Sequence, residues 1–156
     1  MWFMNHLINP IVRLILRSPF HRLFSGSIVL ITYQGRKSGR TYTLPVQYVQ
    51  ADKLIYILPG ASEQKTWWRN LRGGAPVRIR LCGQDLSAQA EVLAGEANGD
   101  EIRDMLDSYL RRFPPSARIH HVRRTPDGSF EAADLQAAAR QMIVVRVAPG
   151  ARADGL

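Results

Sequence analysis

A short basic turn between two apolar stretches constrains this 156-residue chain more than any other feature. The turn is GRKSGR at residues 35–40, preceded by residues 27–34 and followed by residues 41–50. Both flanking stretches are rich in β-branched and aromatic residues, which favour strands. The sequence therefore predicts two antiparallel strands joined by this turn.

The same turn concentrates hydrogen-bond donors and positive charge. Its two glycines allow positive φ angles, and Arg36, Lys37, Arg40 and the Ser38 hydroxyl accompany them. Backbone N–H groups and cations that converge in this way suit a phosphate or a carboxylate. The alternative is a solvated hairpin tip whose cations contact only water, and the turn by itself does not separate the two.

A second landmark, TWWRNL at residues 66–71, precedes GGAPV at residues 73–77. Together with the turn, Pro45 and a strand predicted at residues 54–59, these motifs resemble the deazaflavin-dependent nitroreductase family. Its members are small split β-barrel proteins that bind a deazaflavin or flavin coenzyme. The resemblance covers roughly residues 27–82, and its specificity comes from the combination of motifs.

The resemblance implies a fold, a coenzyme and a reaction. The implied fold is α+β, mainly β: a split β-barrel of the FMN-binding-protein type with flanking helices. The implied reaction is that of an oxidoreductase, with hydride transfer from reduced coenzyme F-420 (8-hydroxy-5-deazaflavin), or alternatively FMN, to a small quinone, nitro or enone acceptor. The residues implied to bind the coenzyme are Arg36, Lys37, Ser38, Tyr42, Thr43, Pro45, Val46, Gln47, Leu58, Pro59, Gly60, Trp67, Trp68 and Asn70.

The chain departs from the family pattern at three places. Tyr42 stands where members often have a further arginine, and residues 59–62 replace a Ser-Lys-Gly-Gly type of loop. No tyrosine follows the Pro114-Pro115 pair at residues 116–120, so Tyr48 or a water molecule is the candidate proton donor. These departures leave open a non-catalytic split barrel that binds a flavin, haem or a lipid.

The distribution of charge along the chain and the motifs it contains limit the kinds of ligand that the protein is expected to bind. Residues 1–82 hold 12 basic and 2 acidic side chains, whereas residues 83–156 hold 9 and 11. A basic half favours a phosphorylated cofactor, an acidic membrane or nucleic acid. No nucleic-acid motif supports the last, so we expect a small-molecule substrate and no nucleic acid. The single Cys82 cannot form an internal disulfide, which fits a reducing cytoplasm. No residue spacing in the sequence predicts a metal site.

The remaining segments complete the expected domain. Residues 1–24 predict a basic amphipathic helix that either packs on the barrel or brings it to a membrane surface. Residues 25–148 form the barrel domain, and residues 149–156 a flexible tail. Split barrels often dimerise, so a homodimer is also expected.

Within the predicted domain, residues 76–92 form a hairpin that turns at residues 83–85. A helix begins at a capping box of Asn98 and Glu101 and stops before Pro114. A second helix spans residues 134–141, and a final strand at residues 142–147 closes the barrel.

Overall fold

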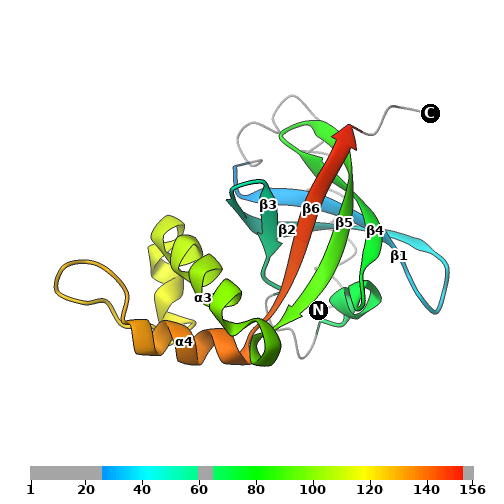
Figure 1. The fold of residues 1–156 in the computed structure, drawn as a ribbon. Coiled ribbons are helices and arrows are strands. Elements are labelled where there is room, and N and C mark those ends of the chain that lie inside the picture. Colours follow the sequence, from blue (N-terminus) through cyan, green and yellow to red (C-terminus); the bar gives the residue numbers. More distant parts are fainter. Residues whose placement is uncertain (1–25, 60–64, 153–156) are drawn as a thin grey trace, which may run out of the picture.

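The computed structural model describes residues 26–59 and 65–152 (Figure 1). The strands in these ranges are β1 (Ile28–Gln34), β2 (Thr41–Ala51), β3 (Leu54–Ile57), β4 (Ala75–Leu81), β5 (Gln84–Ala94) and β6 (Ile143–Arg152). The helices are the short 3-10 helices η2 (Trp67–Leu71) and η3 (Pro114–Arg118) and the α-helices α3 (Gly95–Arg112) and α4 (Ala132–Gln141).

The strands form a closed barrel in the order β1-β2-β3-β6-β5-β4, and each neighbouring pair is antiparallel. Helices α3 and α4 lie next to each other on one side of this barrel (Figure 1). Closure pairs every strand with two neighbours along part of its length, which leaves little sheet edge exposed to other chains. The predicted α+β, mainly β, barrel with flanking helices is confirmed.

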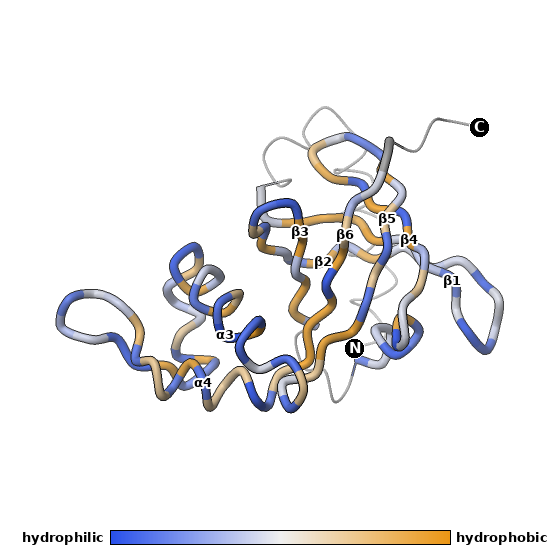
Figure 2. The backbone as a smooth tube through the Cα atoms, in the orientation of Figure 1, coloured by the Kyte–Doolittle hydropathy of each residue, from blue (hydrophilic) through white to orange (hydrophobic). Residues whose placement is uncertain are grey.

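The alternation of side chains along the strands produces two hydrophobic cores. One fills the barrel and includes Ile31, Ile79 and Val145. The other lies between the barrel wall and the helices and includes Val144 and Leu106. Val144 and Val145 are adjacent in β6 and serve different cores because successive strand residues point to opposite faces. Figure 2 shows the matching apolar stretches along the strands and along the helices.

A polar cluster also joins the helical layer to the barrel. Glu101 of α3 accepts hydrogen bonds from the Tyr56 hydroxyl at 3.0 Å and from the Arg146 guanidinium at 2.9 and 3.0 Å. Arg146 also contacts Glu91 at 2.6 Å. Burial, followed by the hydrogen bond to Glu101, raises the pKa of Tyr56 to about 12. The cluster fixes α3 against β3 and β6.

The helix expected to start at Asn98 begins earlier. Helix α3 starts at Gly95 and kinks at Asn98, where φ is −124° and ψ is 29°. Glu101 binds the barrel instead of completing a capping box. Gly95 allows this start because a Cβ there would lie 2.0 Å from the Ala139 carbonyl oxygen, so α3 begins directly against the end of α4.

Several other boundaries differ from the expected ones. The β4–β5 hairpin turns at Cys82 and Gly83, so the strand resumes at Gln84. Strand β6 continues past the expected domain boundary at residue 148 and pairs with β5 as far as Arg152. Pairing with a neighbouring strand thus holds the first half of the segment that was predicted to be a flexible tail.

The expectations for residues 1–24 and 153–156 lie outside the described residues. No helix within the described ranges is both long and apolar enough to cross a membrane.

Candidate functional site

The basic turn between β1 and β2 has a compact, hydrogen-bonded backbone. The Gly35 N–H donates to the Arg40 carbonyl, and the Gly39 N–H donates to the Gly35 carbonyl, both at 2.8 Å. Of the two glycines, only Gly39 has a positive φ, of 64°. Gly35 is required for another reason, because a Cβ there would lie 2.7 Å from Ser38 Oγ and 2.8 Å from the Tyr42 ring.

The turn is fastened to η2, which carries the second sequence motif. The Arg36 backbone N–H donates to Asn70 Oδ1 at 3.0 Å, and Asn70 Nδ2 donates to the Trp67 carbonyl at 2.9 Å. The Arg36 guanidinium donates to the Arg72 carbonyl. Arg36 and Asn70, both expected to bind a ligand, therefore have a structural task in joining the two motifs.

The remaining cations of the turn face solvent. Lys37 and Arg40 are exposed, and neither has an ion-pair partner among the described residues. Ser38 Oγ accepts from the Arg40 N–H at 3.3 Å and lies 3.1 Å from the Tyr42 hydroxyl. Lys37 and Arg40 can therefore offer positive charge to a ligand, while the Arg36 guanidinium keeps its charge but is held by the Arg72 carbonyl.

A row of aromatic side chains lies beside the turn. Tyr33 and Tyr42 are stacked with ring centroids 5.6 Å apart, and Trp67 lies 6.0 Å from Tyr33. Burial, and then proximity to Tyr42, raises the pKa of Tyr33. Tyr42 remains 39% exposed and offers its ring to solvent. Trp68, in contrast, is only 4% exposed and belongs to the barrel core, as one of the two tryptophans was expected to do.

Strand β2 has an open stretch after the turn. It pairs with β1 from Thr41 to Gln47, whereas its pairing with β3 begins only at Tyr48. The other edge of this stretch has no strand partner among the described residues. Pro45, which has no N–H to donate, lies in this stretch, and the register with β1 runs past it without a bulge. The edge position expected for Pro45 is confirmed, and the bulge is not found.

The other predicted residues of β2 and β3 are divided between core and surface. Val46 packs against the barrel core, whereas Leu58 packs against the helical core and Pro59 is buried. Thr43 lies on the outer face of β2, where its hydroxyl is 2.9 Å from that of Thr32. Gly60 lies outside the described residues.

Tyr48, the candidate proton donor, points into the barrel. It is 5% exposed, and burial, then Cys82, raises its pKa. Its neighbour Gln47 has the opposite orientation and accepts a hydrogen bond from the Tyr109 hydroxyl at 3.4 Å. Because successive residues of a strand point to opposite faces, Tyr48 points away from the face of β2 on which Thr43 and Gln47 lie.

The Tyr109 hydroxyl belongs to a small polar cluster that sequence reasoning missed. It lies 3.3 Å from Ser116 Oγ, and its ring contacts the edge of His120 at a centroid distance of 5.9 Å. Burial, and then the neighbouring His121, lowers the pKa of His120. In the sequence, Tyr109 has only the helical spacing of a core residue, which carries no sign of a polar partner on β2.

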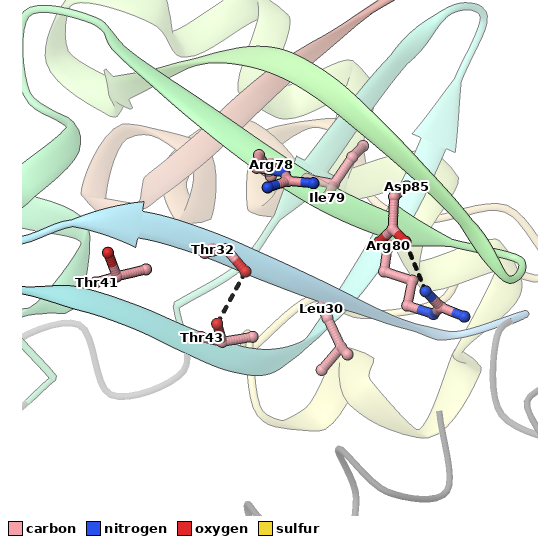
Figure 3. A pocket seen from close by; sticks show the side chains of 8 residues that line it. All are labelled: Leu30, Thr32, Thr41, Thr43, Arg78, Ile79, Arg80 and Asp85. Atoms are coloured by element: carbon pink, nitrogen blue, oxygen red, sulfur yellow. Dashed lines mark hydrogen bonds and ion pairs between the residues drawn. The ribbon is translucent and has the colours of Figure 1, made fainter. Parts of the chain in front are cut away.

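A cavity of about 500 Å³ opens on the outer face of β1, β2 and β4, close to the turn (Figure 3). Its polar lining consists of Thr32, Thr41, Thr43, Arg78, Arg80 and Asp85. Thr43 is the member of the predicted coenzyme site in this lining. The described residues contain no group of three or more His, Cys, Asp or Glu side chains that could hold a metal ion.

The described residues thus form a small closed antiparallel barrel that carries a cationic turn with an aromatic row beside it. The pattern of one family, described as F420H(2)-dependent quinone reductase, matches residues 19–117. The chain belongs to this family. It is an oxidoreductase that uses the deazaflavin coenzyme F420, as the motifs at residues 35–40 and 66–71 predicted.

Solved structures support the fold. An F420-H2 dependent reductase (FDR-A) is 21% identical, with a TM-score of 0.52, and the match covers 78% of this chain and 93% of that chain. A chain described as a domain-swapped dimer has the same identity and TM-score, and the match covers 78% of this chain and 79% of that chain. No curated protein matches this sequence significantly.

The residues around the turn fit such a coenzyme. Lys37 and Arg40 are the cations that would meet its anionic end, and neither is used in an ion pair within the described residues. The exposed ring of Tyr42 and the partly buried ring of Trp67 supply flat apolar surface. The exposed cations, the aromatic row and the cavity all lie next to the same turn.

Proposed function

We propose that this enzyme reduces a quinone along the open stretch of β2, between the basic turn and the Tyr109 hydroxyl. The family match supports the quinone as acceptor. The single structural observation that carries the proposal is the position of Thr41–Gln47, which pairs with β1 but has no second strand partner among the described residues, with two exposed cations at one end and Gln47 bonded to Tyr109 at the other. An extended molecule with an anionic end and a planar end suits this arrangement.

The residues of this chain divide into binding and positioning roles. Lys37 and Arg40 bind the anionic end of the coenzyme, and Thr43, Pro45 and Gln47 line its path. Arg36 and Asn70 are positioning residues, because they hold the turn on η2. When bound, the coenzyme supplies the hydride, and the protein supplies orientation and charge.

A quinone that accepts a hydride becomes a hydroquinone anion and needs one proton at its oxygen. The Tyr109 and Ser116 hydroxyls form a connected pair next to Gln47. We assign the proton transfer to this pair. Ser116, the less buried member, gives its proton to the quinone oxygen, while the Tyr109 hydroxyl turns from Gln47 to Ser116 and passes its own proton on; a solvent proton then returns to Tyr109 through Ser116. Tyr48 has no part in this step, because it lies inside the barrel.

The test is an anaerobic assay in which reduced coenzyme F420 is mixed with enzyme and a water-soluble quinone, and oxidation of the coenzyme is followed by absorbance. Tyr109→Phe should lower kcat by about 100-fold, the usual contribution of a positioned proton donor, and change coenzyme affinity much less, since only its hydrogen bond to Gln47 is lost. Tyr48→Phe, the matched control, should keep kcat and its solvent isotope effect.

Two outcomes contradict different parts of the proposal. Full turnover by Tyr109→Phe would remove the proton assignment and leave the reductase in place. If no quinone oxidises the reduced coenzyme but a nitro or enone compound does, the quinone is not the acceptor, and the nitro or enone class takes its place in the proposal. Reduced FMN in a parallel assay tests the coenzyme preference.

Expectations about assembly and location remain predictions. A homodimer is supported by the matching fold described as a domain-swapped dimer, and light scattering of the purified protein would test it. Contact with a membrane through residues 1–24 and a cytoplasmic location also remain predictions, as does the separation of segment 1–24 from the barrel; the boundary between segments 25–148 and 149–156 is not kept, because β6 continues to Arg152. Sedimentation with anionic liposomes, with and without residues 1–24, would test the membrane contact.

A further inference from the structure

Ile119, the residue directly after η3, leaves most of its apolar side chain in solvent. It is 74% exposed, whereas Tyr42, the other exposed large hydrophobic side chain of the described residues, is 39% exposed. A single exposed apolar residue is common on protein surfaces. The neighbours of Ile119 therefore decide whether this exposure has a task.

The segment around η3 winds with three residues per turn. The Ser116 N–H donates to the Phe113 carbonyl at 2.9 Å, and the Ile119 N–H donates to the Ser116 carbonyl at 3.0 Å. Ile119 itself keeps helical backbone angles, with φ −67° and ψ −34°. Side chains three positions apart on a 3-10 helix lie one above the other. Ser116 and Ile119 therefore share one edge of η3, and Phe113 stands at the start of that edge.

The burial of the other positions shows where this edge lies. Ala117 is buried and belongs to the helical core, so its side of η3 faces inward. Arg118 is exposed, so its side faces solvent. The edge of Ser116 and Ile119 lies between these two sides, and Ser116 Oγ is 3.3 Å from the Tyr109 hydroxyl there.

The same edge lies next to the end of the open stretch of β2. The Tyr109 hydroxyl that meets Ser116 also donates to Gln47 of β2 at 3.4 Å. The Phe113 ring is half-buried and lies 5.1 Å from the Tyr109 ring. The Ser116 hydroxyl therefore stands between two apolar side chains, with Phe113 one turn before it and Ile119 one turn after it.

A polar hydroxyl flanked by apolar side chains suits one kind of acceptor. Such a site can meet an oxygen that needs a proton and, on either side of that oxygen, hydrocarbon that leaves water on binding. The two flanking residues differ in what they offer. Phe113 is partly packed into the helical core, whereas Ile119 is free to be covered.

We propose that Ile119 is a specificity-determining residue that covers an aliphatic substituent of the acceptor, next to the oxygen that Ser116 protonates. This inference rests on the proposed function, since Ser116 and Tyr109 mark the place of the acceptor only if they supply its proton. It is a property of this chain in particular, because residues 116–120 contain no tyrosine. An isoleucine offers hydrocarbon contact and no hydrogen bond.

The experiment compares two quinones that have the same ring. One is tetramethyl-benzoquinone, and the other carries a butyl chain in place of one methyl group. Both rings are fully substituted, which leaves no free ring carbon for the exposed thiol of Cys82. The anaerobic assay with full-length enzyme and reduced coenzyme F420 gives the ratio of kcat/KM for the butyl and the tetramethyl compound.

Wild type should favour the butyl compound. Ile119→Ser should lower the ratio by about tenfold, the selectivity that a few methylene groups gain from an apolar contact. The change should appear mainly in KM, because the contact is made in the ground state as well as in the transition state. Equilibrium dialysis of each quinone against the coenzyme-free protein gives the same comparison without turnover.

Two further variants keep the test specific. Ile119→Leu retains an aliphatic side chain and should keep most of the preference. Arg118→Ser changes the adjacent exposed residue on the outer side of η3 and should leave the ratio as in wild type. Because Ile119 is exposed, its replacement leaves the fold intact, and circular dichroism checks this.

The outcomes separate this inference from the proposed function. If wild type reduces both quinones and Ile119→Ser keeps the wild-type ratio, Ile119 does not contact the acceptor and the reductase proposal stands. An unchanged ratio together with weaker sedimentation of Ile119→Ser with anionic liposomes would assign the residue to a lipid surface instead. If wild type reduces neither quinone but dialysis still shows an Ile119-dependent preference for the butyl compound, the contact stands and the proposed reaction falls.

Discussion

The barrel and the helical layer use their charged side chains in different ways. In the helical layer, Arg103, Arg111 and Arg123 each contact an aspartate, at distances of 2.7–3.1 Å. On the barrel, Lys37 and Arg78 are exposed without such a partner in the described residues. Three basic residues of the helical layer are thus held by carboxylates, whereas Lys37 and Arg78 of the barrel remain available.

This contrast means that net charge alone does not locate a binding site. Exposed ion pairs contribute little to stability, typically up to about 1 kcal/mol, but they cancel the field that a ligand would feel. An unpaired cation next to a cavity keeps that field. Changes to barrel cations should therefore alter ligand affinity, and changes to the polar contacts of the helical layer should alter stability.

The largest effect is expected when both cations of the turn are removed. Lys37→Ala with Arg40→Ala should weaken coenzyme binding by roughly 100-fold, since two charge-assisted hydrogen bonds are lost. The urea midpoint should stay within error of wild type. Arg103→Ala with Arg111→Ala makes the same change in charge and should leave affinity unchanged. Equal losses of affinity in the two double variants would show that only total charge matters.

A smaller effect is expected at the junction between the two regions. Glu101→Ala removes the acceptor shared by Tyr56 and Arg146 and should lower the free energy of unfolding by about 1 kcal/mol. The pKa of Tyr56, now about 12, should fall toward its ordinary value, which an ultraviolet titration measures. Coenzyme affinity should not change. An unaltered Tyr56 titration would contradict the assigned contact.

The smallest effect is expected at the exposed pair of Arg123 and Asp134. Hydrogen bonds from Arg123 lower the pKa of Asp134 from 3.8 to about 2. A carboxylate whose folded pKa is depressed stabilises the fold above its unfolded pKa, and this stabilisation is lost as pH falls through the folded pKa. Arg123→Ala should therefore flatten the loss of stability between about pH 4 and pH 2, measured by urea unfolding.

The control for this prediction lies in the same layer. The pKa of Asp127 is also lowered to about 2, mainly by hydrogen bonds from Thr125 and Ser129. Arg123→Ala leaves those contacts intact, so the acid sensitivity due to Asp127 should persist. A pH profile identical to that of wild type would mean that Arg123 does not set the charge state of Asp134 in solution.

Much of the fold follows from local patterns. Alternating and apolar stretches located β1, β2 and β4 to within about a residue, because strand periodicity and turn residues are properties of neighbouring positions. The paired prolines at 114 and 115 fixed the end of α3 in the same way. The start of α3 escaped such patterns, since Gly95 is required by a contact with the distant Ala139.

The candidate site was only partly predictable, for a related reason. The motifs identified the turn and η2. Arg36 and Asn70, which were expected to bind the coenzyme, instead join the turn to η2 through their own hydrogen bonds. Tyr48 was chosen as a proton donor because it is a tyrosine close to the right motif, and the parity of β2 directs it into the core. Tyr109, sixty-two positions from Gln47, meets it only in the folded chain.

Taken alone, the order of amino acids indicated the strands, the basic hairpin and the family resemblance, with F420 or FMN as the implied coenzyme, because each depends on short motifs of neighbouring residues. The folded barrel decided which cations stay unpaired, which face of β2 meets solvent and which strands place Thr32, Thr43 and Arg78 in one row. Those features depend on register and closure, which bring together residues that are far apart in sequence and so leave no local pattern.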